Sequence, residues 1–587
     1  MENLTVKVNG VEVSVPAGST VLEAAHIAGI EIPTLCYMKE INEIGACRIC
    51  VTEVNEGRGF RLVAACVYPC SNNMEILTSS PKVIESRKKT LELILSTHNR
   101  KCLSCVRSGN CELQTLAKDL GVEMEDIYDG NSNTYEIDDS AAHMYRDNNK
   151  CILCRRCVAV CEKTQGIGVI GANERGFKTF IGSAFDMGSA FDMGLGETSC
   201  VSCGQCIAVC PTGAIAEKDY TKDVMAAIAD PDKHVIVQTA PAVRAALGEC
   251  FDMPIGTNVE GKMVSALRLL GFDKVFDTDF AADLTIMEEA NEFIGRVKNG
   301  GKLPLITSCS PGWIKYCEHY FPDMTENLSS CKSPQQMFGA TAKTYYAEKM
   351  GIDPKNIVMV SIMPCTAKKF EIGRDDQNAA GVPDVDFALT TRELGRMIKR
   401  AGINFTALQD GKFDEPLGIS TGAAVIFGAT GGVMEAALRT AVHTLTGADV
   451  VDFPEVRGTE GIKEATYKVG DLDVKVAVAS GLSNARELLT KVQNGEADYH
   501  FIEIMGCPGG CVNGGGQPQQ PATVRNFTDL RAERAKALYA QDAAMPIRKS
   551  HENPAIKAVY EEFFGEPGSH KAHEILHTTY VKRTINK

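Results

Sequence analysis

Hydrophobic and polar residues alternate along the first 80 residues as they do in strands that are buried on one side. From Leu4 to Val15 nearly every second residue is apolar, and the alternation breaks only at Asn9-Gly10. Asn-Gly favours a two-residue hairpin turn, because both turn positions need positive φ. A helix-like stretch follows at 21–28. The pattern predicts a small β-rich domain over residues 1–80.

The pattern changes twice more along the chain. Residues 81–125 have the spacing of helices, and residues 126–146 are polar and predicted to be rich in loops. From about residue 226, apolar runs at 234–240, 303–307 and 357–363 alternate with amphipathic segments. This is typical of an α/β domain with buried parallel strands. A functional site is expected at the loops beyond the strand ends.

Composition limits the class of protein. The chain has 587 residues, of which 44% are hydrophobic, so several globular domains are expected. No apolar run reaches the roughly 18 residues of a membrane span, and no signal-peptide pattern is visible, which favours a cytoplasmic protein without a membrane partner. The formal net charge of −14 argues against nucleic-acid binding.

The chain has 23 cysteines, and 19 of them can be assigned to iron–sulfur ligation, in a series from the N-terminus to the C-terminal third. Two C-x2-C-x2-C-x3-C runs, at 151–161 and 200–210, have the spacing of a bacterial two-cluster ferredoxin. In such domains the last cysteine of each run ligates the other cluster. The predicted [4Fe–4S] ligand sets are Cys151, Cys154, Cys157 and Cys210, and Cys161, Cys200, Cys203 and Cys206. The tandem repeat at 182–193 between the runs is interpreted as a loop duplication.

Two smaller cysteine groups precede this module. The first suits a [2Fe–2S] cluster and resembles the plant-type ferredoxin domain; its ligands are Cys36, Cys47, Cys50 and Cys66. Cys70 is the alternative to Cys66, which is favoured for its Ala-Cys context. The second group suits either zinc or a [4Fe–4S] cluster with one imidazole ligand; its members are His98, Cys102, Cys105 and Cys111. His98 is expected to keep helical register with these cysteines.

Three further cysteine loops lie in the α/β region. They are Thr-Ser-Cys-Ser-Pro-Gly-Trp at 307–313, Met-Pro-Cys-Thr-Ala-Lys-Lys-Phe-Glu at 363–371, and the glycine-rich segment at 503–516. Glycine lets the backbone approach closely, and its amides can donate hydrogen bonds to sulfides. The loops therefore predict one more cluster, closely wrapped by backbone.

These loops resemble the signature loops of [FeFe]-hydrogenases, and the N-terminal modules resemble the accessory domains of the larger members. The resemblance covers essentially the whole chain and is closest to the catalytic subunit of multimeric, NAD(P)-linked, electron-bifurcating enzymes. It implies a multidomain α+β and α/β fold. The implied parts are a β-grasp [2Fe–2S] ferredoxin domain (1–80), a [4Fe–4S] domain with one histidine and three cysteine ligands (81–125), a bacterial 2[4Fe–4S] ferredoxin domain (140–225), an H-cluster domain (226–525) and a C-terminal helical belt resembling the hydrogenase small subunit (526–587).

The resemblance also implies an H-cluster, a [4Fe–4S] cubane joined through one cysteine to a di-iron subsite with CO, cyanide and dithiolate ligands. Cys365 and Cys507 would ligate the cubane, and Cys511 would bridge to the subsite. Lys368 would donate to a cyanide. The other implied cofactor contacts are Ala240, Pro241, Met363, Pro364, Met505, Gln335, Phe427 and Gly428.

A proton route is implied as well. Cys309 would pass protons to Glu289, Ser329 and Glu292, with Arg296 beside them. The spacing places the two carboxylates and the guanidinium on one helix face. A buried carboxyl group can have a pKa near neutrality, as such a relay requires.

The sequence departs from the family at one position, because Cys309-Ser310 stands where the family has two adjacent cysteines. Ser310 could ligate the cubane through oxygen, although an alkoxide suits iron–sulfur ligation less well than a thiolate. Alternatively the loop shifts, so that Cys309 ligates and Ser310 relays protons, or Cys331 contributes instead. The sequence leaves these alternatives open.

Two short motifs carry less weight. The glycine-rich segment 427–432 lacks the order of a dinucleotide fingerprint. His573-Glu574-x-x-His577 matches the short zinc-protease pattern, but it lies near the chain end and is interpreted as structural.

The predicted function is reversible H2 oxidation, 2H+ + 2e− ⇌ H2. Electrons would pass through the accessory clusters to ferredoxin, to flavin- and NAD(P)-binding partner subunits, or to both, and maturation proteins would be further partners. One alternative is a stand-alone ferredoxin-dependent hydrogenase. Another is a non-catalytic electron-transfer subunit, since the first 215 residues also resemble the large iron–sulfur subunit of respiratory NADH dehydrogenases. A third is a hydrogenase-like iron–sulfur protein without the di-iron subsite.

Overall fold

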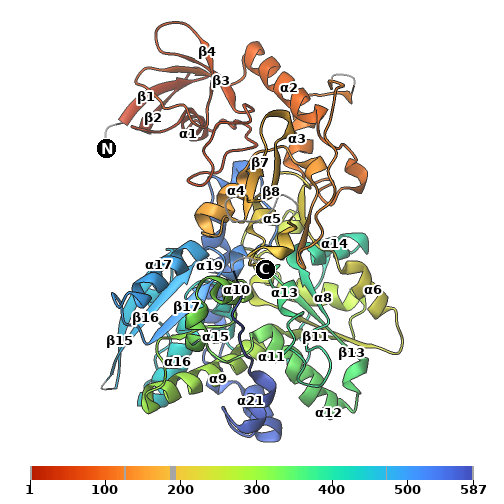
Figure 1. Cartoon of the computed structure of the whole chain (residues 1–587), viewed down its shortest axis with the longest axis vertical. Coiled ribbons are helices and arrows are strands. Elements are labelled where there is room, and N and C mark those ends of the chain that lie inside the picture. Colours follow the sequence, from red (N-terminus) through yellow and green to blue (C-terminus); the bar gives the residue numbers. More distant parts are fainter. Residues whose placement is uncertain (1–2, 125–126, 185–192, 471, 585–587) are drawn as a thin grey trace.

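The computed structural model describes residues 3–124, 127–184, 193–470 and 472–584. Small N-terminal modules are stacked on a larger α/β domain, and the C-terminal segment runs over that domain (Figure 1). The tandem repeat at 182–193 falls largely on residues outside these ranges.

The N-terminal module is a five-stranded sheet of order β2-β1-β5-β3-β4 with one helix. β1 (Asn3–Val8) and β2 (Val11–Pro16) form the predicted hairpin, and Asn9 and Gly10 at its turn both have positive φ. α1 (Val21–Ile27) begins at a capping box between Thr20 and Glu23. The remaining strands are β3 (Val51–Asn55), β4 (Arg61–Ala64) and β5 (Glu75–Leu77).

The next module contains α2 (Pro81–Ser96) and α3 (Glu112–Asp119). α2 ends at Ser96, so His98 follows the helix and the expected helical register is wrong. The helix does not continue because the Ser96 hydroxyl donates to the Leu93 carbonyl and the Asn99 amide donates to the Asn149 carbonyl of a distant segment.

The two-cluster module is built from two short antiparallel pairs, β6 with β9 and β7 with β8. A short helix follows the start of each cysteine run, α4 in the first and α5 in the second. The bounds are β6 (Met144–Arg146), α4 (Arg156–Ala159), β7 (Ile170–Asn173), β8 (Phe180–Ser183), α5 (Gln205–Val209) and β9 (Ile215–Glu217).

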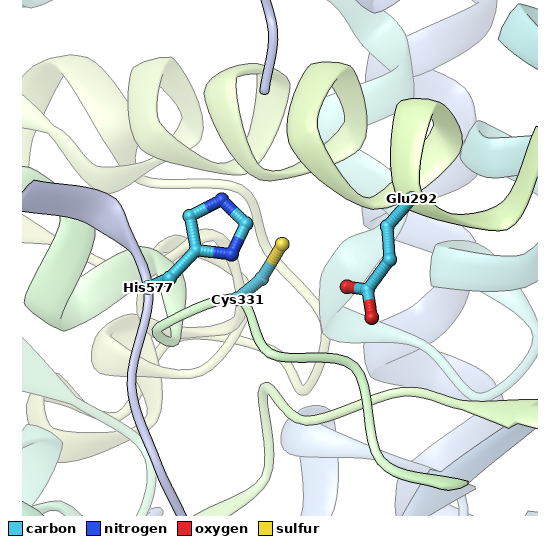
Figure 2. Close-up of side chains that lie close together, drawn as sticks. All are labelled: Glu292, Cys331 and His577. Carbon is cyan, nitrogen blue, oxygen red and sulfur yellow. The ribbon is translucent and has the colours of Figure 1, made fainter. Parts of the chain in front are cut away.

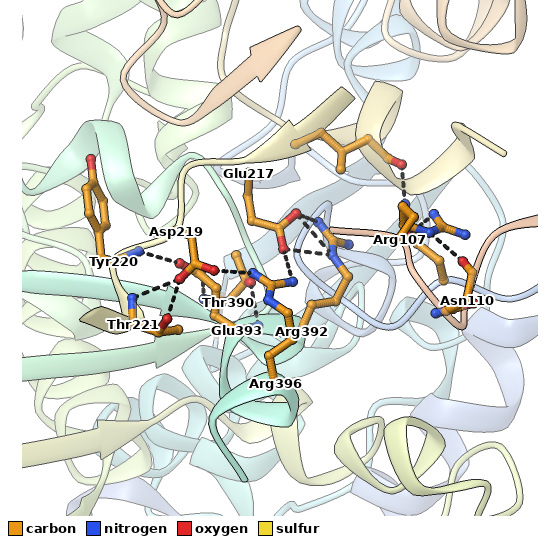
Figure 3. A network of polar contacts seen from close by, with 12 residues as sticks. Arg107, Asn110, Glu217, Asp219, Tyr220, Thr221, Thr390, Arg392, Glu393 and Arg396 are labelled. Atoms are coloured by element: carbon orange, nitrogen blue, oxygen red, sulfur yellow. Dashed lines mark hydrogen bonds and ion pairs between the residues drawn. The ribbon is translucent and has the colours of Figure 1, made fainter. Parts of the chain in front are cut away.

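A buried ion pair ties this module to the α/β domain (Figure 3). Glu217, at the end of β9, accepts from Arg392 at 2.7 Å and from Arg396 at 2.8 Å, both on α14 (Thr391–Arg400). Burial alone would raise the pKa of Glu217, but the two guanidinium groups outweigh it and hold the pKa well below its usual range.

The α/β domain contains two sheets. The first is parallel with the order β11-β10-β13-β14, and the second has the order β12-β17-β16-β15, with β15 antiparallel to its neighbour. β10 (His234–Thr239) and β13 (Ile357–Met363) lie where the sequence predicted strands. The other strands are β11 (Lys274–Asp277), β12 (Leu305–Ile306), β14 (Phe387–Thr390), β15 (Ile462–Val469), β16 (Leu472–Ser480) and β17 (Phe501–Met505).

Helices cover both sheets, and the longest is α9 (Thr278–Asn299). The C-terminal segment adds α19 (Leu530–Ala544), α20 (Pro554–Val559) and α21 (His570–Leu576). After α21 the chain lies alongside residues 330–332, where Cys331 and His577 form an antiparallel bridge. Within the described ranges, no helix combines the length and the apolar character that crossing a membrane requires.

Candidate active site and its iron–sulfur relay

Three cysteines meet at the carboxyl ends of the central strands. Cys365 follows β13, and Cys507 and Cys511 follow β17. They lie close enough that Cys365 and Cys511 both influence the Cys507 thiol. Burial raises the pKa of all three thiols, so thiolates here require a nearby cation such as iron. This donor set fits an iron–sulfur cofactor.

The glycines of the third loop allow the close wrapping that the sequence predicted. A Cβ on Gly514 would lie 2.2 Å from the Pro364 carbonyl oxygen, and one on Gly515 would lie 2.2 Å from the Cys203 carbonyl oxygen. The Gly516 amide donates to the Pro364 carbonyl at 2.7 Å. A side chain at either position would therefore push apart the two cysteine loops on which this segment packs.

Lys368 is held beside the thiols by fixed partners. Its ammonium donates to the Cys309 carbonyl at 3.2 Å, to the Ser333 hydroxyl at 2.8 Å and to the Glu371 carboxylate at 2.9 Å. Gln335 donates to the same Glu371 oxygen at 2.9 Å. Glu371 therefore positions two predicted site residues, although no role was predicted for it from the sequence. The available signal was its place three residues after Lys368 in one helical turn.

The other predicted contacts also lie at strand ends or in the adjoining turns. Ala240 and Pro241 follow β10, Met363 ends β13 and Pro364 follows it, and Met505 ends β17. Their locations agree with the expectation that the site lies beyond the strand ends.

The glycine-rich segment 427–432 lies close by, and a protein carboxylate already binds its amides. Phe427 and Gly428 form a short 3-10 turn before α16 (Gly432–Thr446). The buried Glu503 carboxylate accepts from the Gly431 amide at 2.7 Å and from the Met434 amide at 2.8 Å. Because Glu503 takes the place that a phosphate would need, the segment is not suited to binding a nucleotide.

Cys309 and Ser310 face different groups. The Ser310 hydroxyl accepts from the Gly506 amide at 3.2 Å, beside Cys507. The Cys309 thiol is influenced by Cys511, Glu289 and Lys368. Both residues therefore lie beside the three cysteines, Cys309 near Cys511 and Ser310 near Cys507.

Cys331, the third alternative for the cubane, lies elsewhere. Its donor atom is grouped with those of Glu292 and His577, and the charged groups that act on it are glutamates. The structure therefore gives no support to its joining Cys365 and Cys507.

The predicted proton route leads away from Cys309 along α9. Glu289 is 1% exposed, and burial, with a smaller contribution from Glu292, raises its pKa to about 8. Its Oε2 has no hydrogen-bond partner among the described residues. The Ser329 hydroxyl donates to Glu292 at 3.1 Å, and Arg296 pairs with Glu292 at 2.6 Å. The side chains of Glu292 and Arg296 are 16% and 17% exposed, so the row reaches the surface.

Comparisons with known proteins agree with this arrangement. Residues 233–515 match the iron only hydrogenase large subunit, C-terminal domain, and residues 528–583 match the iron hydrogenase small subunit. The NADP-reducing hydrogenase subunit HndD of Solidesulfovibrio fructosivorans is 52% identical over 99% of this chain and 100% of its own length. The chain belongs to the [FeFe]-hydrogenases.

Two further relatives support this assignment. Iron hydrogenase 1 of Clostridium pasteurianum is 44% identical over 98% of this chain and 100% of its own length. The solved structure of HydA(deltaEFG), described as revealing stepwise [FeFe]-hydrogenase H-cluster assembly, is 44% identical. The match covers 62% of the present chain and 99% of the HydA(deltaEFG) chain, with a TM-score of 0.56.

The accessory modules of the hydrogenase match iron–sulfur domains as well. Residues 1–81 match a 2Fe-2S iron-sulfur cluster binding domain, and residues 150–214 match a 4Fe-4S dicluster domain. Residues 87–125 match the NADH-ubiquinone oxidoreductase-G iron-sulfur binding region, which favours iron–sulfur over zinc for the group at 98–111.

In the first module the structure groups Cys66, and not Cys70, with the other cysteines. The Cys66 thiol is influenced by Cys36, Cys47 and Cys50, whereas the pKa of Cys70 is raised to about 11 by burial and Glu23. The preference for Cys66 therefore agrees with the geometry.

The two-cluster module shows the crossed arrangement that its spacing predicts. The first set lines one cavity; its members are Cys151, Cys154, Cys157 and Cys210. In the second set, Cys161 and Cys200 influence Cys206, and Cys203 is influenced by both Cys206 and Cys507. The second set therefore adjoins the active site.

The His98 imidazole is suited to bind a metal. Burial lowers its pKa to about 4, so it is neutral, and its Nδ1 has no hydrogen-bond partner in the described part of the chain. Cys105 and Cys111 lie near each other in the same module. The Cys111 sulfur is 3.7 Å from the Pro211 carbonyl oxygen, next to Cys210.

The two N-terminal cysteine groups both adjoin the first [4Fe–4S] ligand set of the two-cluster module. The Asn42 side-chain amide donates both to the Cys36 carbonyl at 2.8 Å and to the Cys154 carbonyl at 3.0 Å. The [2Fe–2S] module thus contacts the same cysteine set as the His98 module. The two N-terminal modules therefore form two branches that meet at the first [4Fe–4S] ligand set.

Proposed function

We propose that this hydrogenase interconverts H2 with protons and electrons at an H-cluster held by Cys365, Cys507 and Cys511. The observation that carries the proposal is the meeting of these three thiols with Lys368 and Cys309 beyond the central strands. When bound, the H-cluster supplies the redox chemistry of H2. The protein supplies ligands, a hydrogen-bonded shell and a path for protons.

Each residue of the proposed shell has a distinct task. Lys368, fixed by Glu371, places an ammonium donor beside Cys309 and favours an anionic ligand there. Ala240, Pro241, Met363, Pro364, Met505, Gln335, Phe427 and Gly428 are proposed to enclose the cofactor. Ser310 is proposed to face the fourth position of the cubane, since its hydroxyl lies beside the residue before Cys507.

Protons are proposed to move between Cys309 and the surface. Glu289 accepts a proton from Cys309 during H2 oxidation and donates one during proton reduction, and a pKa of about 8 suits both directions near neutral pH. The Ser329 hydroxyl connects it to Glu292. Arg296 holds Glu292 in place at the outer end.

Electrons are proposed to pass through four accessory clusters, one [2Fe–2S] and three [4Fe–4S], one of which has His98 as a ligand. The proximity of Cys203 to Cys507, whose charge acts on the Cys203 thiol, supports entry through the second [4Fe–4S] set. The acceptors proposed are ferredoxin and partner subunits that bind flavin and NAD(P), with electron bifurcation between them, in the cytoplasm. The name of HndD as an NADP-reducing hydrogenase subunit supports a hetero-oligomer.

Infrared spectroscopy tests the catalytic proposal. The chain is produced with the hydrogenase maturation proteins, and its spectrum is compared with that of a Cys511→Ala control. Bound CO and cyanide bands are expected in the natural chain and not in the control. Their absence from a protein that carries its full accessory iron would refute the proposal and favour a hydrogenase-like iron–sulfur protein.

Two further measurements test the finer assignments. Ser310→Cys should change the electron paramagnetic resonance of the cubane while leaving the accessory signals in place, and an unchanged cubane signal would contradict the position given to Ser310. Purification from the native source should give a complex that contains flavin. A single chain that exchanges electrons with ferredoxin alone would favour the stand-alone hydrogenase.

A further inference from the structure

A second group of metal-ligand side chains lies at the outer end of the proposed proton route (Figure 2). It consists of Glu292, Cys331 and His577, whose carboxylate oxygen, sulfur and imidazole nitrogen all lie within 4.8 Å of one another. Cys331 is fully buried. The three residues come from α9, from the segment before α11 (Pro334–Thr341) and from the end of α21, so the group forms only in the folded chain.

The backbone fixes two of these residues opposite each other. Cys331 and His577 form an antiparallel bridge, flanked by a hydrogen bond from the Lys332 amide to the Leu576 carbonyl at 2.9 Å and one from the Thr578 amide to the Ser330 carbonyl at 2.8 Å. The sulfur and the imidazole therefore meet without any movement of the chain.

The His577 ring is oriented as in metal sites. Its Nε2 lies 3.1 Å from the Glu288 carboxylate, and that carboxylate is itself held by the Tyr560 hydroxyl and by the Gly568 amide at 2.9 Å. When Nε2 donates to Glu288, Nδ1 presents its lone pair on the other side of the ring. A carboxylate that holds the second nitrogen is the usual partner of a metal-ligating histidine.

Nδ1 faces the other two ligands. The Ser330 hydroxyl lies 2.8 Å from His577 Nδ1 and 3.2 Å from a Glu292 oxygen, so it bridges the gap between them. An ion in this gap would take the place of the hydroxyl or use it as a weak fourth ligand.

The local charge also suits a cation. Besides Glu292, the carboxylates of Glu288 and Glu289 act on the Cys331 thiol, and Arg296 pairs with Glu292 at 2.6 Å. Burial and then Glu292 raise the pKa of the Cys331 thiol, so the sulfur is protonated in the absence of a metal. Binding of a divalent ion would release this proton and form a metal–thiolate bond, which balances the charge.

We propose that Glu292, Cys331 and His577 bind one divalent ion of the zinc type, and that the bound ion blocks the outer end of the proton route. One sulfur, one nitrogen and one carboxylate oxygen, with a fourth position for water, match the ligands and the tetrahedral preference of Zn2+. A thiolate in the set disfavours Mg2+ and Ca2+. The side chain of Glu292 is 16% exposed and offers the entrance. The blocking effect rests on the relay role of Glu292 in the proposed function.

Zinc binding is tested on the matured, fully iron-loaded chain. The protein is incubated with Zn2+ and desalted, its zinc is counted by mass spectrometry, and the zinc ligands are read by X-ray absorption at the zinc edge. One retained zinc with one sulfur ligand is expected. Cys331→Ala and Cys331→Ser should lose it, whereas Cys250→Ala, at a half-buried cysteine that packs on Gly395, should keep it. Zinc without a sulfur ligand, or zinc retained by both Cys331 variants, would overturn the site.

The blocking effect is tested separately. H2 evolution is measured for each variant with and without Zn2+, and each variant is compared with itself. Zinc should lower the rate of the natural chain by about 10²-fold or more, as loss of a proton-transfer group does, and should leave the Cys331→Ala rate unaltered. Sulfur-ligated zinc without inhibition would overturn the blocking effect alone. A matured chain that binds zinc but has no H2 activity without it would count against the proposed function and leave the metal site standing.

Discussion

Glu289 is the position where one conservative substitution should remove proton transfer and leave the structure of the site intact. Its carboxyl group is 1% exposed, its Oε2 lacks a hydrogen-bond partner among the described residues, and its pKa is about 8. Glu289→Gln keeps the shape of the side chain but removes the titrating proton. At pH 7 the protonated form of a group with this pKa exceeds the ionised form by about tenfold. The glutamine variant therefore lacks a proton donor that most molecules of the natural chain carry.

The size of the effect follows from the role. A positioned acid–base group contributes about 10²- to 10⁴-fold to a rate, or about 3–5 kcal/mol of barrier. Glu289→Gln is therefore expected to lower H2 evolution and H2 oxidation by about this factor, while the infrared bands of the cofactor stay in place. Glu289→Asp keeps a carboxyl group but shortens the side chain. Its H2 rates should lie between those of the natural chain and those of Glu289→Gln.

The same Glu289→Gln substitution should raise the stability of the folded chain while it lowers the H2 rates. The pKa of Glu289 is raised in the folded chain from a usual value of 4.5, so between about pH 4.5 and 8 the unfolded chain releases a proton that the folded chain keeps. Glu289 therefore has no effect on the free energy of unfolding below pH 4.5. Between pH 4.5 and 8 it lowers that free energy progressively, by about 1.4 kcal/mol per pH unit at most. Glutamine removes it. The variant should therefore melt at a higher temperature than the natural chain at pH 8, with a smaller difference at pH 5.

The assay compares H2 rates at fixed driving force from pH 5.5 to 9, together with melting temperatures. Glu92→Gln is the matched control, because Glu92 is a buried glutamate in the remote helix α2 and should retain activity within about twofold. A Glu289→Gln chain that keeps more than half of the natural rate would refute the relay. So would a rate loss accompanied by loss of the cofactor bands.

The accessory modules give three further predictions. Glu217→Gln leaves the buried Arg392 without its carboxylate and should cost about 3–5 kcal/mol, seen as earlier melting and faster proteolysis of the two-cluster module. His98→Ala should shift or abolish the paramagnetic signal of one [4Fe–4S] cluster and spare the others; four unaltered signals would contradict its ligation. Cys66→Ser should disturb the [2Fe–2S] signal and Cys70→Ser should not, and the reverse result would exchange their roles.

The sequence predicted well those features that depend on neighbours along the chain. The hairpin at Asn9-Gly10 and the strand Ile357–Met363 follow from local alternation and apolar runs. The crossed ligand sets follow from spacing, because tight loops fix which sulfurs can converge. Helical register at His98 was predicted wrongly, since tertiary hydrogen bonds near Asn149 end the helix first.

Contacts between distant segments could not be predicted in this way. The branching of the clusters depends on Asn42, which contacts Cys36 and reaches Cys154 across 112 residues of sequence. His577 reaches Glu288 across 289 residues. No periodicity encodes such pairings, which are set by how the modules pack.

Packing also separates the proposed path of protons from the proposed path of electrons. Electron transfer needs closely spaced metal clusters, whereas proton transfer needs titratable groups within hydrogen-bond reach. Cys309 and Ser310 are adjacent; the Cys309 thiol lies near Cys511 and Glu289, and the Ser310 hydroxyl accepts from the Gly506 amide beside Cys507. The C-terminal belt then brings His577 against Cys331 at the outer end of the proposed proton route. A ligand bound there would act on proton supply while leaving the cluster contacts intact, so the two flows can be regulated separately.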